Sequence, residues 1–178
     1  MEEIATEAGL GKASLYYYFS DKDDLFRAVV KEEMDKFEKL VRSLITAEAM
    51  ATVKAAVYVR ERFHFFNRLL NLNILEQTNS GVTKPALAKM YTNFRKRELE
   101  YLNKIFKQGK ESREFEFTST ARIAEAFLHV LAGLRMRFIR HLATPVIASS
   151  QFAKLEREVT LVTEIFVKGI APRNKRSG

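Results

Sequence analysis

The chain has 178 residues, of which 47% are hydrophobic, with no cysteine and a net charge of +8. This length allows one or two domains with a sizeable core, and the lack of cysteine excludes disulfides, thiol catalysis and cysteine-ligated zinc. The N-terminus lacks the basic segment of a secretory signal and no apolar run is long enough to span a membrane, so we expect a cytoplasmic protein.

Apolar residues recur at helical spacing almost throughout and strand signals are nearly absent, which predicts an all-α fold. The charge is unevenly distributed: residues 1–45 hold 7 Lys/Arg against 10 Asp/Glu, so the basic excess lies in the remainder. The net charge is therefore weak evidence for nucleic-acid binding, and the local motifs carry more weight.

The first segment, residues 4–26, contains two short helical patterns around a glycine turn. Ile4, Ala5 and Ala8 form one apolar face of the first helix. Gly9 is predicted to end that helix, at a position where a positive φ costs a glycine little.

The second helical pattern carries Tyr16, Tyr17 and Tyr18 in a row. Leu15 and Phe19 are four residues apart and are predicted to point inward, with Tyr17 on the opposite side. Outward tyrosines leave ring area in water, but against a duplex their rings can rest on sugars while their hydroxyls bond phosphates. The alternative is that they pack against neighbouring helices.

The next helix is predicted to begin after Ser20 and Asp21 as candidate N-caps, with Asp23 placed to answer Ser20. Lys22 then lies beside the positive end of the helix dipole, an unfavourable place for a cation. A phosphate held by this lysine and the free amides would explain it, and an ordinary solvated lysine is the alternative.

Three motifs occur here in order and without gaps: IAxEAG, Leu-Tyr-Tyr-x-Phe and Asp-Lys-Asp-Asp-Leu-Phe. The segment resembles the DNA-reading head of the tetracycline-repressor (TetR/AcrR) family of bacterial transcriptional regulators. The resemblance implies a helix-turn-helix whose second helix enters the major groove of an operator. The DNA-binding residues that it implies are Lys12, Ala13, Ser14, Tyr16, Tyr17, Tyr18 and Lys22.

A phosphate-binding P-loop is the competing interpretation of the run Gly11-Lys12-Ala13-Ser14. It fails because Ala13 follows the lysine, Thr6 stands at the first glycine position and no strand precedes the run.

In the family, one more helix precedes the segment equivalent to residues 1–8. We therefore expect the reading frame to extend upstream by roughly 25–30 residues, encoding one amphipathic helix and its lead-in. The alternative function is that of an all-α dimeric ligand-binding or interaction protein that does not bind DNA.

Five longer helices are expected after the reading head. Their predicted ranges are 21–45, 48–77, 85–108 with Gly109 as its stop, 118–142 and 148–169, followed by a basic tail from Arg173. We expect residues 1–45 to form the helix-turn-helix head with its connecting helix, and residues 46–178 to form the regulatory and dimerisation body.

The last helix has apolar residues at spacings of 3, 4, 3 and 4, as in a helix that packs along its length. These are Phe152, Leu155, Val159, Val162 and Phe166, with Leu161 and Ile165 as a second edge. The resemblance implies a homodimer through a four-helix bundle of the last two helices. Alternatively, these stripes only close the core of the monomer.

Members of the family also bind a small-molecule effector inside the body. The aromatic candidates for such a pocket are Phe63, Phe66, Tyr91, Phe94, Tyr101 and Phe127. Glu98 interrupts an apolar stripe, and a buried charge needs a partner. It would face the effector as a polar anchor, or pair with Arg95 or another internal arginine.

The three histidines, His64, His129 and His141, form no site by their spacing. Metalloprotease and nucleophile-elbow motifs are missing, and the carboxylate pairs fall on charged helix faces where solvation explains them. We therefore expect no enzyme activity, metal or cofactor, and interpret the chain as a ligand-responsive repressor.

Overall fold

The computed structural model describes residues 1–77, 84–140 and 149–172. Within these ranges the chain forms seven α-helices and no strand, which confirms the all-α prediction. Their bounds are α1 Glu2–Glu7, α2 Lys12–Tyr18, α3 Lys22–Thr46, α4 Ala51–Gln77, α5 Lys84–Glu111, α6 Thr120–Arg140 and α7 Ser149–Gly169. The predicted connection between the ranges 48–77 and 85–108 lies outside the described residues except for Lys84, which begins α5. The predicted connection between the ranges 118–142 and 148–169, His141 and the basic tail also lie outside them.

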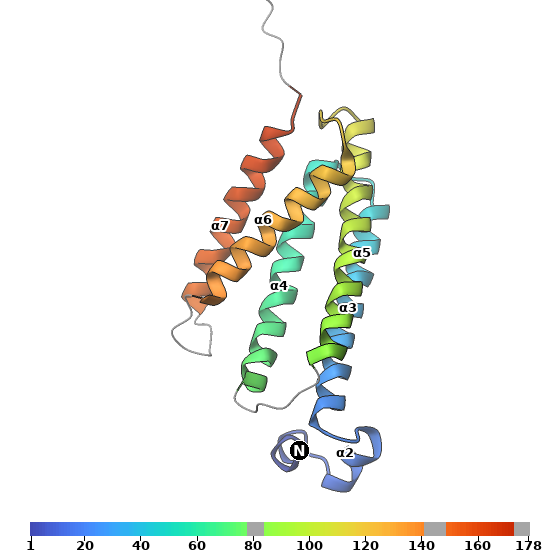
Figure 1. Cartoon of the computed structure of the whole chain (residues 1–178), viewed down its shortest axis with the longest axis vertical. Helices are drawn as coiled ribbons and strands as arrows, with labels where there is room; N and C mark the ends of the chain where they lie inside the picture. Colours follow the sequence, from blue (N-terminus) through green and yellow to red (C-terminus); the bar gives the residue numbers. More distant parts are fainter. Residues whose placement is uncertain (78–83, 141–148, 173–178) are drawn as a thin grey trace, which may run out of the picture.

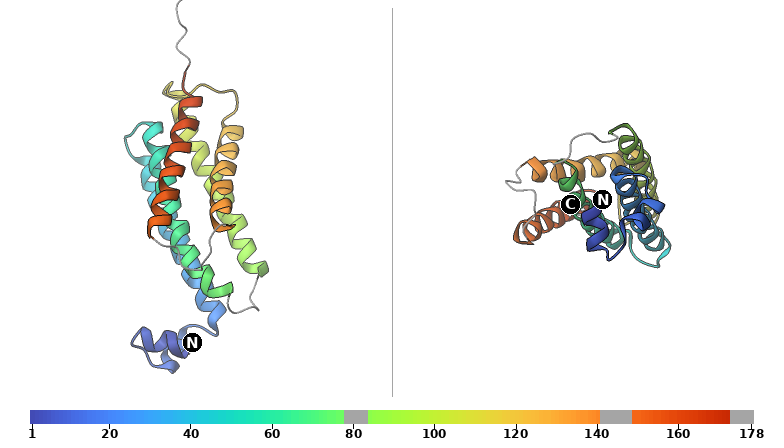
Figure 2. Two further views of the ribbon diagram at one scale, coloured as in Figure 1. Left: turned by 90° about the vertical axis from the view of Figure 1, so that its left-hand side faces the viewer. Right: turned by 90° about the horizontal axis from the view of Figure 1, so that it is seen from below.

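Helices α3 to α7 form an elongated body, and α1 and α2 lie beyond the first turn of α3 at one end of it (Figure 1). The left view of Figure 2 shows the same separation between this small head and the body. Helix α3 packs on α4 and α5, α4 packs on α7, and α5 packs on α6. No described helix is both long enough and apolar enough to cross a bilayer.

The body has one core, and α3 contributes to it with Val30, Met34, Phe37 and Val41. The ring of Phe37 stacks on Phe65 of α4 at 5.1 Å between centroids. The apolar side of α3 therefore faces the body, as expected of an amphipathic helix of this length.

The turn between α1 and α2 is as predicted, with Gly9 at φ 67°. The N-cap of α3 is Asp21, one of the two predicted candidates, but the residue that pairs with Ser20 differs from the prediction. Asp21 is the N-cap and accepts from the amide of Asp24 (2.7 Å), while the Asp24 carboxylate accepts from the amide of Ser20 (3.2 Å). The pairing of Asp23 with Ser20 was wrong because the residue three positions after this N-cap is Asp24.

Gly109 does not end a helix, since α5 continues to Glu111. A Cβ at this position would lie 2.1 Å from a ring carbon of Phe115 and 2.9 Å from Cβ of Ala51. The glycine therefore allows the buried Phe115 ring to lie directly against α5. The prediction of a helix stop was wrong because the reason for this glycine is a contact between segments.

Candidate functional sites

The tyrosine face of α2 points into solvent. Tyr17 and Tyr18 are 83% and 72% exposed, and Tyr16 is 45% exposed, whereas Leu15 is buried against the head. The rings of Tyr17 and Tyr18 meet edge to face at 5.1 Å. The predicted orientation of this helix is thus confirmed, and an aromatic, hydroxyl-bearing surface stands at the free end of the molecule (Figure 1).

The other predicted DNA contacts lie at the start of α2 and of α3. Lys12, Ala13 and Ser14 are the exposed first turn of α2, and Lys22 is the exposed first residue of α3. Lys12 forms an exposed ion pair with Glu2 of α1, and the hydrogen bond and charge of Glu2 raise the pKa of Lys12. Among the described residues Lys22 has no ion pair, so its charge is available to a ligand.

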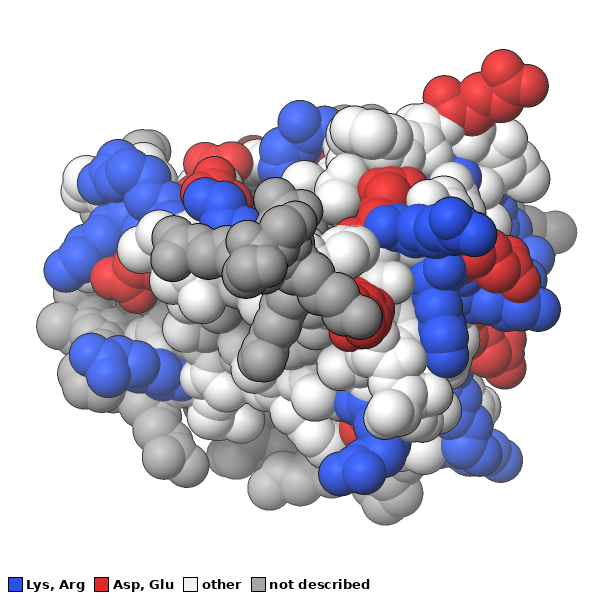
Figure 3. Space-filling view, turned by 90° about the horizontal axis from the view of Figure 1, so that it is seen from above, with Lys and Arg blue, Asp and Glu red and all other residues white. Residues whose placement is uncertain are grey.

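The charged side chains at the far end of the body are of mixed sign. At the end of the body farthest from the head, Lys and Arg are interspersed with Asp and Glu (Figure 3). The positive excess of residues 46–178 therefore does not by itself mark a nucleic-acid site.

A cavity of about 330 Å³ lies between α4, α5 and α6. Its walls include Phe66, Tyr91, Phe94 and Glu98, which are four of the seven residues predicted to bind an effector. Volumes of this order are typical of small-molecule sites.

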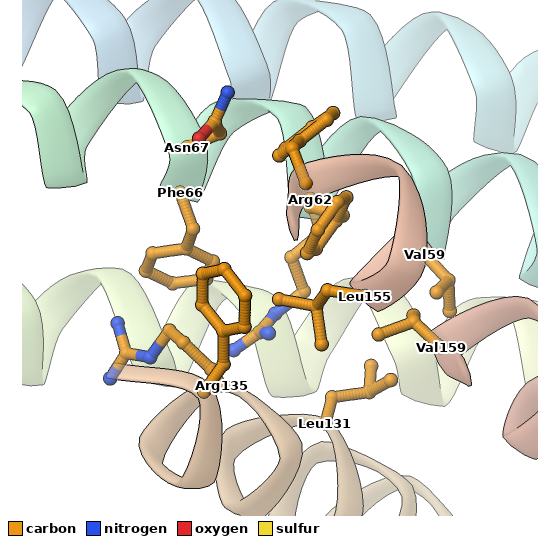
Figure 4. A pocket seen from close by; sticks show the side chains of 11 residues that line it. Val59, Arg62, Phe66, Asn67, Leu131, Arg135, Leu155 and Val159 are labelled. Atoms are coloured by element: carbon orange, nitrogen blue, oxygen red, sulfur yellow. The ribbon is translucent and has the colours of Figure 1, made fainter. Parts of the chain in front are cut away.

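A second cavity, of about 20 Å³, lies toward α7 and is lined by Phe63, Phe152, Leu155 and other apolar side chains (Figure 4). It shares Arg62, Phe66 and Arg135 with the larger cavity. These three side chains therefore separate a larger, more polar space from a small apolar one.

Tyr101 and Phe127, the other two predicted effector residues, line neither of these two cavities. The Tyr101 hydroxyl donates to Glu38 of α3 (3.3 Å). Phe127 packs against Phe166, with 4.7 Å between ring centroids. Both rings are core, because the helices cross in a way that turns them away from the space beside Glu98.

Glu98 is buried, with 2% of its surface exposed, and is fully partnered. It accepts from the Tyr58 hydroxyl (2.7 Å) and from Arg62 Nε (2.5 Å). Burial, followed by the Glu98 charge, raises the pKa of Tyr58, so this phenol stays neutral and serves as a donor. Arg95 is not the partner, since its Nη2 lies 2.6 Å from His129 Nε2.

The two arginines in the wall that the cavities share were not predicted as site residues. Arg62 shares a helical face with Val59 and Phe66, and Arg135 shares one with Leu128 and Leu131. A cation within an apolar stripe is the sequence signal that would have identified each of them.

The histidines give no metal centre in the described part of the chain, where no group of three His, Asp or Glu could hold an ion. His64 lies 3.5 Å from Glu156 of α7 at a partly exposed position. The contact joins α4 to α7 at the surface of the body.

The predicted seam of α7 faces its own body. Leu155 and Val159 are buried, and Phe152 stacks on Phe63 at 4.6 Å. The outer edge stays in solvent, with Leu161 56% and Ile165 60% exposed. Val130 and Met136 of α6 are also exposed, so apolar surface remains on both of the last two helices.

Residues 1–29 match the family described as bacterial regulatory proteins, tetR family. A crystal structure of a transcriptional regulator from Cytophaga hutchinsonii is 35% identical in sequence, with a TM-score of 0.85; the match covers 97% of this chain and 88% of that one.

The fatty acid metabolism regulator protein of Bacillus subtilis is 26% identical over 72% of this chain. The match spans 66% of that relative, just under two thirds of its length. A crystal structure of the transcriptional regulator FadR from Bacillus subtilis, in complex with stearoyl-CoA, is 22% identical with a TM-score of 0.67, covering 95% of this chain and 87% of that one. At this identity the likeness extends to the fold alone.

Proposed function

Because the chain belongs to the TetR family of bacterial regulatory proteins, we propose that it is a ligand-responsive repressor that binds operator DNA as a homodimer. Regulators of this family are not enzymes; they bind DNA as dimers and respond to small molecules. The observation that carries the proposal is the exposed tyrosine face of α2 beside Lys12 and Lys22.

The chemistry of this face suits a duplex. Ala13 and Ser14 are small, so the first turn of α2 can approach base edges in the major groove. On binding, Lys12 breaks its ion pair with Glu2 and contacts the DNA instead. Tyr16, Tyr17 and Tyr18 contact the sugar–phosphate backbone, and Lys22 with the first amides of α3 holds a phosphate. A cytoplasmic location accords with this role.

A selection from random duplexes with the full chain, followed by fluorescence titration of the selected operator, tests the assignment. Lys22→Ala should weaken binding to all sequences and reduce the salt dependence by about one unit of slope. Substitutions at Lys12 or Ala13 should instead change the sequence preference. Lys39→Ala, an exposed lysine further along α3, is the matched control.

The same titration can contradict the proposal. If Tyr17→Ala and Lys22→Ala leave operator affinity unchanged, the head is misassigned. The alternative of a dimeric ligand-binding or interaction protein without DNA binding would then be favoured.

For the domain organisation, we infer that residues 1–45 form the DNA-binding head with its connecting helix and that residues 46–178 form the regulatory and dimerisation body. The exposed apolar edges of α6 and α7 support dimerisation through these two helices. Isologous pairing would place two heads about a two-fold axis and match a two-fold operator.

We place the effector in the cavity between α4, α5 and α6, against Phe66, Tyr91, Phe94 and Glu98, with Phe63 beyond the shared wall. Tyr101 and Phe127 are left out of this site. The fatty acid regulator of Bacillus subtilis and the stearoyl-CoA complex of FadR support an amphipathic effector with an acyl chain.

A further inference from the structure

The wall between the two cavities carries a positive charge that no described carboxylate balances. Arg62 and Glu98 neutralise each other at 2.5 Å. Arg135 has no described carboxylate within 4 Å, and its Nε is buried without a hydrogen-bond partner. The cluster of Arg62, Glu98 and Arg135 thus holds one charge in excess.

The ring of Phe66 brings the two arginines together. The guanidinium carbons of Arg62 and Arg135 lie 4.4 Å and 4.3 Å from its centroid. In Figure 4 the two side chains, one from α4 and one from α6, converge on this ring at the edge of the cavity. Both arginines also line the larger cavity, together with Arg95, so a ligand there would meet them.

This arrangement is costly without a ligand. Burying a guanidinium costs hydration free energy, and the cation–π contact with Phe66 offsets only part of that cost. Burial, and then the charge of Arg62, lower the pKa of Arg135. An anion in the cavity would satisfy the Nε donor and balance the charge, and the planar guanidinium fork is suited to an oxyanion.

We propose that the effector is an amphipathic carboxylic acid whose single carboxylate binds Arg135 beside the Arg62–Glu98 pair. This inference rests on the proposed function and names the chemical class of its effector. A carboxylate balances the excess charge of this cluster and brings one negative charge near Glu98, whereas a phosphate monoester brings nearly two and is repelled more strongly by Glu98. The apolar part of the ligand packs against Phe66, Leu69 and Phe94.

Calorimetric titration of the full chain with decanoate, decanol, decylammonium and decyl phosphate tests this, because these probes share a chain and differ in the head. Decanoate should bind at least about tenfold more tightly than the other three. Arg135→Met keeps the volume of the side-chain stem and removes the charge. This variant should bind decanoate no more tightly than decanol, and its affinity for decanol should equal that of wild type. Arg122→Met, an exposed arginine on the same helix, is the matched control.

Thermal unfolding of the ligand-free proteins separates a ligand-binding arginine from a structural one. We expect Arg135→Met to melt at the wild-type temperature or above, because it removes an unbalanced buried charge. If that variant does not fold, Arg135→Lys serves instead: it keeps the charge, loses the planar fork, and should still bind decanoate more weakly than wild type.

Equal binding of decanoate and decanol, or an unchanged decanoate affinity in both Arg135 variants, would overturn the inference. Tighter binding of decyl phosphate, or of decanoyl-CoA titrated in the same way, than of decanoate would overturn the choice of a carboxylate. These results differ from a failure of the proposed function. If decanoate binds through Arg135 but operator affinity does not change, the carboxylate site is supported and the proposed ligand-responsive repression is contradicted.

Discussion

At the scale of single residues, Glu114 stabilises a helix that lies far from it in sequence. Its carboxylate oxygens accept from the amides of Ala51 (2.9 Å) and Thr52 (3.0 Å), the first two residues of α4. The hydroxyls of Thr52 and Ser112 donate to the same carboxylate. Glu114 thus satisfies amides that the helix leaves free and places a negative charge at the positive end of its dipole.

We predict that Glu114→Gln costs about 1–2 kcal/mol of stability at neutral pH. Burial alone would raise the pKa of Glu114, but the hydrogen bonds from Thr52 and Ala51 outweigh it and hold the pKa below its usual 4.5. A depressed carboxyl pKa contributes stability above about 4.5, and that stability is lost as the pH falls through the lower folded-state value. The difference between wild type and variant should therefore shrink as the pH falls below about 4.5.

Urea unfolding followed by circular dichroism, at neutral pH and at about pH 3.5 with one protein concentration, measures both effects. Glu116→Gln, an exposed neighbour, is the control and should change stability by less than about 0.5 kcal/mol. A Glu114→Gln penalty that stays the same at both pH values would contradict the capping role.

At the scale of elements, α7 has two apolar faces, one buried and one exposed. The face with Leu155 and Val159 is buried in its own body, so it is unavailable to a second subunit. The edge with Leu161 and Ile165 is exposed in the isolated chain, and so are Val130 and Met136 on α6. If these side chains form the core of a dimer interface, replacing one of them by a charged residue should weaken dimerisation strongly.

We predict that Ile165→Lys converts the dimer to a monomer at micromolar concentration, because two lysines would be desolvated about the two-fold axis. The stability of the monomer should change by no more than about 0.5 kcal/mol, since this position is in solvent there. Sedimentation velocity measures the state, and Val53→Lys on exposed α4 surface is the control. A variant that remains dimeric would place the interface elsewhere.

At the scale of the whole molecule, α3 is the physical link between head and cavity. Its first residue belongs to the proposed DNA surface, and its middle is buried in the body core. Glu33 of α3 pairs with Arg68 of α4 (2.6 Å), and Glu38 of α3 pairs with Arg97 of α5. A ligand that moves α4 against α5 therefore acts on the helix that carries the head.

We predict that a ligand of the cavity lowers operator affinity by roughly 5- to 150-fold, which corresponds to about 1–3 kcal/mol of coupling. By linkage, the operator must lower the affinity for that ligand by the same factor. Titrating the ligand with and without operator measures the change in ligand affinity. Titrating operator with and without ligand measures the change in operator affinity, and the two factors should agree.

Arg68→Ala should reduce this coupling factor while each separate affinity stays close to wild type, since Arg68 lines neither cavity and is half exposed. Arg60→Ala, which removes an exposed arginine of α4 that pairs with the adjacent Glu61, is the control. A coupling factor of one in the wild-type protein would leave a binding protein without a switch.

The features that the sequence determined by itself are local ones. Helical periodicity placed the five long helices to within a few residues, and it turned Leu15 inward and Tyr17 outward on α2. The glycine at position 9, directly after the first helical pattern, also indicated a positive φ there. These follow from a repeat of 3.6 residues and from backbone sterics, which act between residues close in the chain.

The tertiary structure alone decided which distant residues meet. Glu98 pairs with Arg62, 36 positions away, rather than with Arg95, and Glu114 caps a helix that begins 63 residues before it. It separated Phe66 from Phe127, made Gly109 a point of close contact, and brought Arg135 to the cavity. The physical reason is that helix crossings and side-chain volumes set these contacts, and a local apolar pattern specifies which face is buried without specifying what is buried against it.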